Sequence, residues 1–181
     1  MRISRTTVCW SLVFFLATPC FLHAQEKNTQ DMRKSCRDFV QGFYDWYVPK
    51  TLKDNPGNTS DLALKYKSHA FSPELLRQLK EDSAAQAKVP GEIVGLDSDP
   101  YLNSQDPGER YVAGKITTKG DRCWVEVYGI WSGKKSEKPN VVPELMLKDV
   151  HWVFVNFHYP EFGDLLSILK NLREGRRKHS N

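Results

Sequence analysis

The hydrophobic pattern of this 181-residue chain changes its period near residue 93, and that change most constrains the fold. Before it, apolar residues recur at helical spacing. After it, they alternate with polar residues in short runs, as in half-buried β-strands. Helices followed by strands predict an α+β fold in which the N-terminal helices pack on one side of a curved antiparallel sheet. The pattern contains no internal repeat and no sign of a second domain.

Three helices are predicted before the change of period. The first runs over residues 31–48, with aromatic side chains along its apolar face, and Pro49 ends it. The second runs over residues 61–70. The third has Ser72 as its N-cap and Pro73 at its first helical position.

Four strands and one more helix are predicted in the second half of the chain. Short turns between neighbouring apolar runs favour an antiparallel meander. A C-terminal helix begins at Asp164 and carries a leucine-rich apolar face. The strands are expected at residues 111–118, 123–132, 141–147 and 151–159.

The last predicted strand is apolar on both faces. The helices can cover only one face of the sheet, so the other face needs a cover from the C-terminal helix, a second copy in a homodimer, or another protein. Strict alternation places Trp152, Phe154 and His158 on one face, and Val153, Val155, Phe157 and Tyr159 on the other.

The amino terminus has the layout of a secretory signal peptide over residues 1–24. Arg2 and Arg5 precede an apolar run at residues 8–17, and cleavage is expected after Ala24. That run is shorter than the roughly 20 residues that a membrane-spanning helix needs, and no later run reaches that length. No transmembrane span is therefore expected.

The signal predicts that residues 25–181 are exported as a single α+β domain, periplasmic or secreted. An alternative is a lipid anchor on Cys20, because residues 16–20 loosely resemble a lipoprotein signal.

Cys36 and Cys123 are the cysteines that remain after cleavage. In an oxidising compartment they can form one intramolecular disulfide or stay as two buried thiols. A reactive thiol is the functional alternative, and it would require a lowered pKa.

The formal net charge is +4, with both signs spread along the chain. The one basic segment is the tail at residues 173–181, which could contact an anionic surface. Cations are also favoured at the end of a helix, so a solvated helix terminus is the better explanation of the tail. Export removes most nucleic-acid partners, and none is expected.

Residues 95–107 concentrate polar side chains between the helical and the strand regions. Their oxygen atoms would suit calcium, but the spacing does not match an EF-hand loop. A nonstandard calcium loop is the alternative; we expect a turn in which Asp and Asn bond to nearby backbone N–H groups, forming a rigid connector at the rim of any pocket. The oxygen donors are Asp97, Asp99, Asn103, Gln105 and Asp106.

Two motifs give the chain a resemblance to a known family. The segment at 97–106, together with the ending Trp-Val-Phe-Val-Asn-Phe at 152–157, resembles a bacterial exported and lipoprotein family called domain of unknown function 3828. The resemblance implies a nuclear transport factor 2-like, or cystatin-like, cone of helices on a curved sheet. It carries over no catalytic residue, and this fold hosts isomerases, hydratases and non-enzymatic binders alike.

A pocket inside such a cone would bring together aromatic and ionisable side chains. Glu126 and Tyr128 share one face of their strand with Trp124, so they are the catalytic candidates if that face is concave. If that face is the outer one, they are ordinary surface residues. Tyr44, Tyr47 and Trp152 join the polar stretch as candidate binding residues.

These features predict a binding module for an envelope protein or for a small apolar ligand in the cone. The alternative is a small enzyme of the isomerase or hydratase type that needs no cofactor. No metal site is expected, since neither His151 nor His158 lies within ligand spacing of a cysteine or carboxylate.

Overall fold

The structure, a computed structural model, describes residues 20–53 and 60–179, with side chains described for 29–53 and 60–178. None of the helices in these ranges is long and apolar enough to cross a membrane. The elements in chain order are α1 (Cys20–Thr51), α2 (Ser60–Tyr66), the 3₁₀ turn η1 (Ser68–Ala70), α3 (Pro73–Gln86), β1 (Arg110–Lys119), β2 (Arg122–Trp131), β3 (Lys134–Lys135), β4 (Val142–Lys148), β5 (His151–Tyr159), β6 (Gly163–Asp164) and α4 (Leu165–His179).

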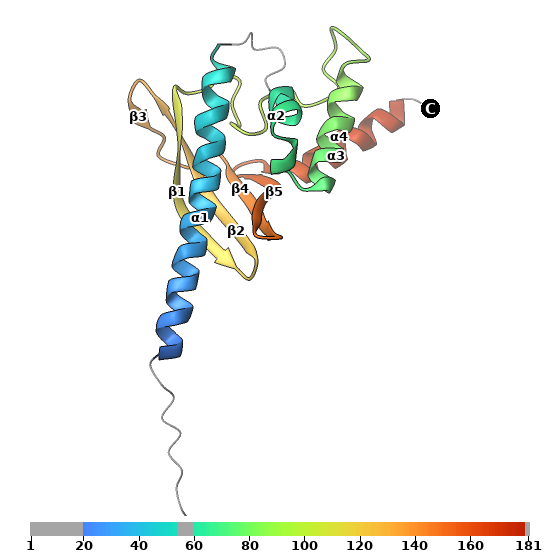
Figure 1. The fold of residues 1–181 in the computed structure, drawn as a ribbon. Helices are drawn as coiled ribbons and strands as arrows, with labels where there is room; N and C mark the ends of the chain where they lie inside the picture. Colours follow the sequence, from blue (N-terminus) through green and yellow to red (C-terminus); the bar gives the residue numbers. More distant parts are fainter. Residues whose placement is uncertain (1–19, 54–59, 180–181) are drawn as a thin grey trace, which may run out of the picture.

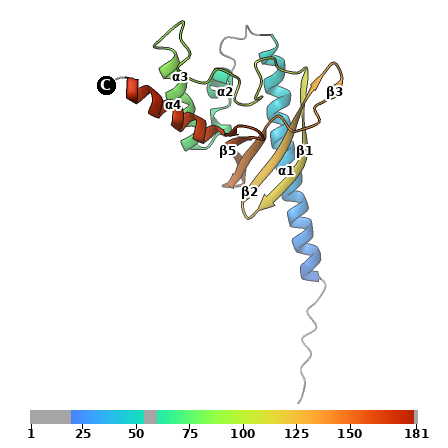
Figure 2. The ribbon, with the colours of Figure 1, turned by 180° about the vertical axis from the view of Figure 1, so that it is seen from behind.

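The strands form one curved antiparallel sheet in the order β1-β2-β4-β5-β6, with the short β3 paired to β2. The predicted meander and the α+β class are therefore confirmed. In Figure 1, α1 runs beside β1 and β2, while α3 and α4 lie at the far end of the sheet, next to β5. Seen from behind, the face of β1 and β2 opposite α1 is not covered by any helix of the described part of the chain (Figure 2).

Helix α1 is longer than the sequence predicts, and Pro49 lies inside it rather than after it. The helix continues because the carbonyl of Val48 still finds partners: the backbone N–H of Leu52 donates to it at 3.2 Å and the Thr51 hydroxyl at 2.9 Å. Tyr47 and Val48 are also buried, so packing holds this last turn in place. The predicted signal peptide falls mainly outside the described residues and stays a prediction.

Helix α3 begins as predicted, with the Ser72 hydroxyl accepting the backbone N–H of Leu75 at 3.3 Å. The preceding helix is shorter than predicted, because α2 stops at Tyr66 and the chain continues as η1. Just after η1, the backbone N–H of Ser72 donates to the carbonyl of Phe154 at 2.8 Å. This bond fixes the start of α3 to β5.

Side chains of α1 close the outer edge of β1. Gln41 accepts the backbone N–H of Ala113 at 2.8 Å and donates to the carbonyl of Tyr111 at 3.0 Å. Arg37 donates to the carbonyl of Gly114 at 3.2 Å. Exposed edge strands pair readily with other chains, so these bonds protect β1 from such pairing.

Cys36 of α1 and Cys123 of β2 form a disulfide across 87 residues of sequence. Both residues are fully buried. Of the alternatives expected for these two cysteines, the disulfide is the one that forms. It ties α1 to the sheet.

The face assignment predicted for β5 is wrong after Val155, because a β-bulge interrupts the alternation. Glu144 pairs with Asn156 while the next residue of β4 pairs with Phe154, which leaves Val155 as the extra residue. Phe157 and Tyr159 therefore join Trp152 and Phe154 in the core, and His158 lies half-exposed on the opposite side. The aromatic residues of β5 do not form two apolar faces.

Aromatic rings fill the space between α1 and the sheet. Phe43 is at the centre, 4.9 Å from Phe154 between ring centroids and stacked on Tyr47 at 5.4 Å. Tyr101 reaches the same cluster from the long connection before β1. The rings that surround these four are Tyr44, Trp46, Phe71 and Phe157.

Candidate functional site

The polar stretch before β1 is a turn organised by Asp99. One carboxylate oxygen of Asp99 accepts the backbone N–H groups of Tyr101 and Leu102, at 2.9 and 3.2 Å. The other accepts the Tyr47 hydroxyl at 2.6 Å. Tyr101 and Leu102 are fully buried, so the turn anchors this connection to the core.

The tyrosines near Asp99 serve packing and hydrogen bonding. The Tyr44 hydroxyl donates to the carbonyl of Tyr101 at 2.8 Å, and the Tyr159 hydroxyl donates to the carbonyl of Pro100 at 2.9 Å. Burial raises the pKa of Tyr44 well above its ordinary value and that of Tyr111 to about 12. These phenols stay neutral at physiological pH.

The remaining polar candidates of the stretch lie at its surface. Gln105 donates to the carbonyl of Asp97 at 3.5 Å, and the carbonyl of Asp106 accepts the Ser104 hydroxyl at 2.6 Å. Within the described parts of the chain, no three His, Cys, Asp or Glu side chains gather closely enough to hold a metal ion.

Glu126 and Tyr128 lie on the outer face of β2, away from α1. They and Trp124 are half-buried, whereas the alternate positions Val125 and Val127 are fully buried in the core. The Tyr128 hydroxyl donates to a Glu126 carboxylate oxygen at 2.8 Å, and this bond raises the pKa of the phenol. Lys135 lies 4.0 Å from the centroid of the Tyr128 ring.

Trp152, the last aromatic candidate, belongs to the core. It is 6% exposed and its indole N–H donates to the Ser35 hydroxyl of α1 at 3.1 Å.

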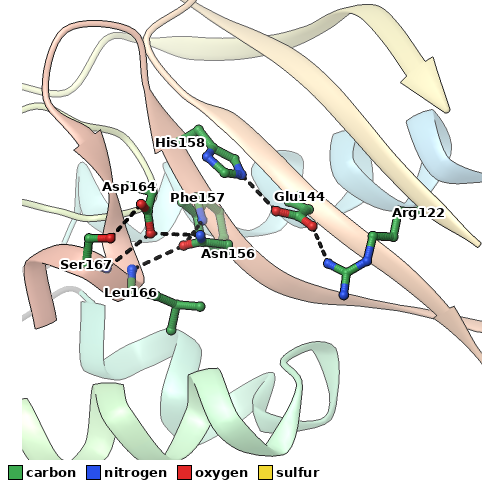
Figure 3. Close-up of polar contacts among 8 residues, drawn as sticks. All are labelled: Arg122, Glu144, Asn156, Phe157, His158, Asp164, Leu166 and Ser167. Atoms are coloured by element: carbon green, nitrogen blue, oxygen red, sulfur yellow. Dashed lines mark hydrogen bonds and ion pairs between the residues drawn. The ribbon is translucent and has the colours of Figure 1, made fainter. Parts of the chain in front are cut away.

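A polar network crosses β2, β4 and β5, with Glu144 at its centre (Figure 3). Glu144 is only 8% exposed, and it forms an ion pair with Arg122 through one oxygen. Its other oxygen lies 2.8 Å from Nε2 of His158. Both carboxylate oxygens are thus occupied by neighbouring side chains, which suits a structural role.

A second network in Figure 3 fixes the start of α4. Asp164 accepts the backbone N–H of Ser167 at 3.1 Å and the Asn156 amide at 2.8 Å. Partial burial acts to raise the pKa of Asp164, but the hydrogen bonds from Asn156 and Ser167 outweigh it and lower the pKa. Asp164 is the N-cap of α4, where the sequence predicted the helix to begin.

A buried ion pair joins the ends of α3 and α4. Asp82, 4% exposed, lies 2.6 Å from the guanidinium of Arg176 and also accepts the backbone N–H of Leu96 at 2.9 Å. Arg176 in turn donates to the carbonyl of Val94 at 2.8 Å. The tail expected as a solvated helix end is therefore folded in part, because Arg176 and Arg173 pack against α3.

Gln86 fixes the loop between α3 and the polar stretch. Its amide oxygen accepts the backbone N–H groups of Val94 and Gly95, both at 3.0 Å, and its amide nitrogen donates to the carbonyl of Glu92 at 2.6 Å. Gly95 is required here, because a Cβ atom would lie 2.8 Å from a carboxylate oxygen of Asp82. The loop is thus held in one conformation.

This loop and the two helices line an open groove of about 980 Å³. Ligand sites in proteins are typically about 300–1,000 Å³ and mostly apolar. The Ile93 side chain at its rim is 75% exposed, although the backbone beside it is firmly held. The apolar walls are made by Ala85, Val89, Val94, Ile168 and Leu172.

A smaller hollow of about 560 Å³ adjoins the groove and shares Ala85, Lys88 and Arg176 with it. Arg173 and Arg177 also line this hollow. Among the described residues, Glu81 of this hollow pairs with Arg173, and no ion pair is found for Lys88 or Arg177. The hollow therefore presents positive charge beside an apolar groove.

Sequence reasoning missed this groove, although two signals for it were present. An aspartate and a glutamine four residues apart, Asp82 and Gln86, lie toward the end of a helix that has apolar residues on one face. The basic tail also carried its arginines at helical spacing. Neither signal identifies its partner, since 94 residues separate Asp82 from Arg176.

Comparisons with known proteins add no relative: no family model, no curated protein and no solved structure matches the chain.

Proposed function

We propose that this protein is an exported binding module that holds a small apolar ligand in the groove between α3 and α4. The observation that carries the proposal is the rigid loop at residues 87–95. A buried ion pair and the Gln86 amide fix its backbone, yet the loop leaves Ile93 exposed beside an apolar groove. A wall built in this way is already formed before a ligand arrives.

The groove is better suited to a ligand than the space between α1 and the sheet. There, aromatic rings pack against one another at centroid distances near 5 Å, as between Phe154 and Phe157 at 5.1 Å. A ligand in that space would have to displace core side chains. The sequence-based proposal of an apolar ligand is kept, and its location moves to the groove.

Export and family membership belong to the same proposal. The signal-like residues 1–24 support export, and the motifs at 97–106 and 152–157 support the resemblance to domain of unknown function 3828. Helices packed against a curved antiparallel sheet are compatible with the nuclear transport factor 2-like cone that the resemblance implies. Mass spectrometry of the mature N-terminus distinguishes cleavage after Ala24 from a lipid on Cys20.

An envelope protein as partner is the second candidate, favoured by the uncovered outer face of β1 and β2 (Figure 2). Trp124 and Tyr128 are half-exposed on that face, and aromatic residues are enriched in protein interfaces. The enzyme alternative has less support. Glu126 and Tyr128 bond to each other on this open face, where apolar surroundings do not tune them for acid–base chemistry.

Filling the groove tests the proposal. Ala85 is half-buried in the groove wall, so Ala85→Trp should occupy the space and abolish binding of an uncharged apolar fluorescent probe such as N-phenyl-1-naphthylamine. Lys80→Trp, on the exposed side of the same helix, is the matched control and should leave probe binding unchanged. Equal probe binding by wild type and Ala85→Trp would show that the groove is not the site.

A further inference from the structure

We infer that the ligand of this groove is an anionic amphiphile with a single aliphatic chain, such as a fatty acid or a lysophospholipid. The inference rests on the proposed function and adds the chemistry of the ligand to it. The chain would lie in the apolar groove, and the anionic head group would lie in the adjoining basic hollow.

The first argument is the joint shape of the two spaces. They share Ala85, Lys88 and Arg176, so a molecule in the groove extends directly into the hollow. The groove walls are aliphatic, with Ile168 and Leu172 on α4 facing Val89 and Val94 on the loop. Aliphatic walls favour an alkyl chain, because the hydrophobic effect scales with the apolar area buried.

The second argument is the charge at the junction. Arg176 forms an ion pair with Asp82 and Arg173 with Glu81, so these two cations are already neutralised in part. Lys88 and Arg177 are both exposed, and no ion pair is found for either within the described residues. The groove lining also includes the exposed carboxylate of Glu92, so the two cations still leave a net positive charge, which matches a carboxylate or a phosphate on the ligand.

The third argument is size. At about 980 Å³ the groove is at the upper end of the volumes typical of small-molecule sites, about 300–1,000 Å³. An acidic amphipathic helix of a partner protein would match the charge as well, but it would bury a much larger surface than this groove offers. The observations therefore favour the single-chain amphiphile, and the peptide is an outcome of the test.

The test is calorimetric titration of the purified full-length protein with three ligands of equal chain length, each below its micelle concentration. The ligands are dodecanoate, the neutral dodecyl maltoside and the cationic dodecyltrimethylammonium. Dodecanoate should bind at least about tenfold more tightly than the neutral ligand, the size of one charge-assisted hydrogen bond. The cationic ligand should bind most weakly.

A charge-reversal variant tests the head-group site separately from the chain site. Lys88→Glu with Arg177→Glu should remove the preference for dodecanoate and leave the affinity for dodecyl maltoside within about twofold. The matched control, Lys80→Glu with Lys115→Glu, changes the net charge equally at exposed positions away from the groove, and it should keep the preference.

The outcomes separate the two proposals. If the neutral and anionic ligands bind equally, the anionic head group is wrong while the apolar groove stands. If no amphiphile binds, both proposals fail. If only an acidic amphipathic peptide binds, and Lys88→Glu with Arg177→Glu abolishes that binding, the inference is overturned in favour of a protein partner.

Discussion

At the residue scale, Val150 has a backbone conformation that its side chain disfavours. Asp149 and Val150 form the turn between β4 and β5 with φ values of 47° and 62°. A hairpin turn with two positive φ angles favours Asn-Gly or Asp-Gly, whereas a β-branched residue is strained there. Val150 is also 86% exposed, so packing does not offset the strain.

Val150→Gly should therefore raise the free energy of unfolding by about 1 kcal/mol, as the relief of strain exceeds the extra chain entropy of glycine. Urea unfolding followed by circular dichroism measures the change. Val150→Ala is the control, because it removes the apolar side chain but keeps the Cβ atom, and it should give little stabilisation. Equal stabilisation by both variants would assign the effect to the exposed side chain rather than to the backbone.

Helix starts could be predicted at this scale, whereas the role of buried aromatic residues could not. Ser72 as an N-cap and Asp164 as a helix start are both confirmed, because capping depends on neighbours within three residues. Tyr44, Tyr47 and Trp152 were predicted to line a pocket, and they lie instead within the packed core. An aromatic residue that lines a pocket and one that packs in the core give the same pattern in the sequence.

At the element scale, the bulge in β5 explains the main error about the sheet. Alternation predicted opposite faces for Phe154 and Phe157, but one unpaired residue between them brings both into the core. A bulge depends on pairing with the neighbouring strand, which a single sequence does not specify. The strand boundaries, by contrast, depend on local period and turns, and they agree closely with the prediction.

The contact between α3 and α4 depends on Asp82, so Asp82→Ala should weaken both stability and binding. The variant removes the carboxylate that accepts the guanidinium of Arg176 and the N–H of Leu96. We expect a loss of about 1–3 kcal/mol in the free energy of unfolding, because a buried donor loses its acceptor. Urea unfolding and dodecanoate titration on the same samples measure the two effects.

Asp31→Ala is the control, since it removes an exposed carboxylate from α1, away from the groove, and both measurements should stay near wild type. A stable Asp82→Ala variant with full binding would mean that the ion pair does not shape the groove.

At the scale of the whole molecule, features that depend on contacts between residues distant in the sequence could not be predicted. The fold class followed from the order of helices and strands, whereas the disulfide was one of the alternatives that Cys36 and Cys123 left open. The groove did not follow, because it depends on a contact between residue 82 and residue 176, which are 94 residues apart in the sequence. Charge and apolar character were visible in the sequence, but their meeting point was not.

The most direct test of the groove is methyl NMR of the isoleucine side chains during titration with dodecanoate. Ile93 and Ile168 line the groove, whereas Ile116 and Ile130 lie on β1 and β2 and act as internal controls. We predict saturable chemical-shift changes at Ile93 and Ile168, with Ile116 and Ile130 unchanged. Shifts at Ile116 or Ile130 alone, or no saturable shift at Ile93 and Ile168, would contradict the account.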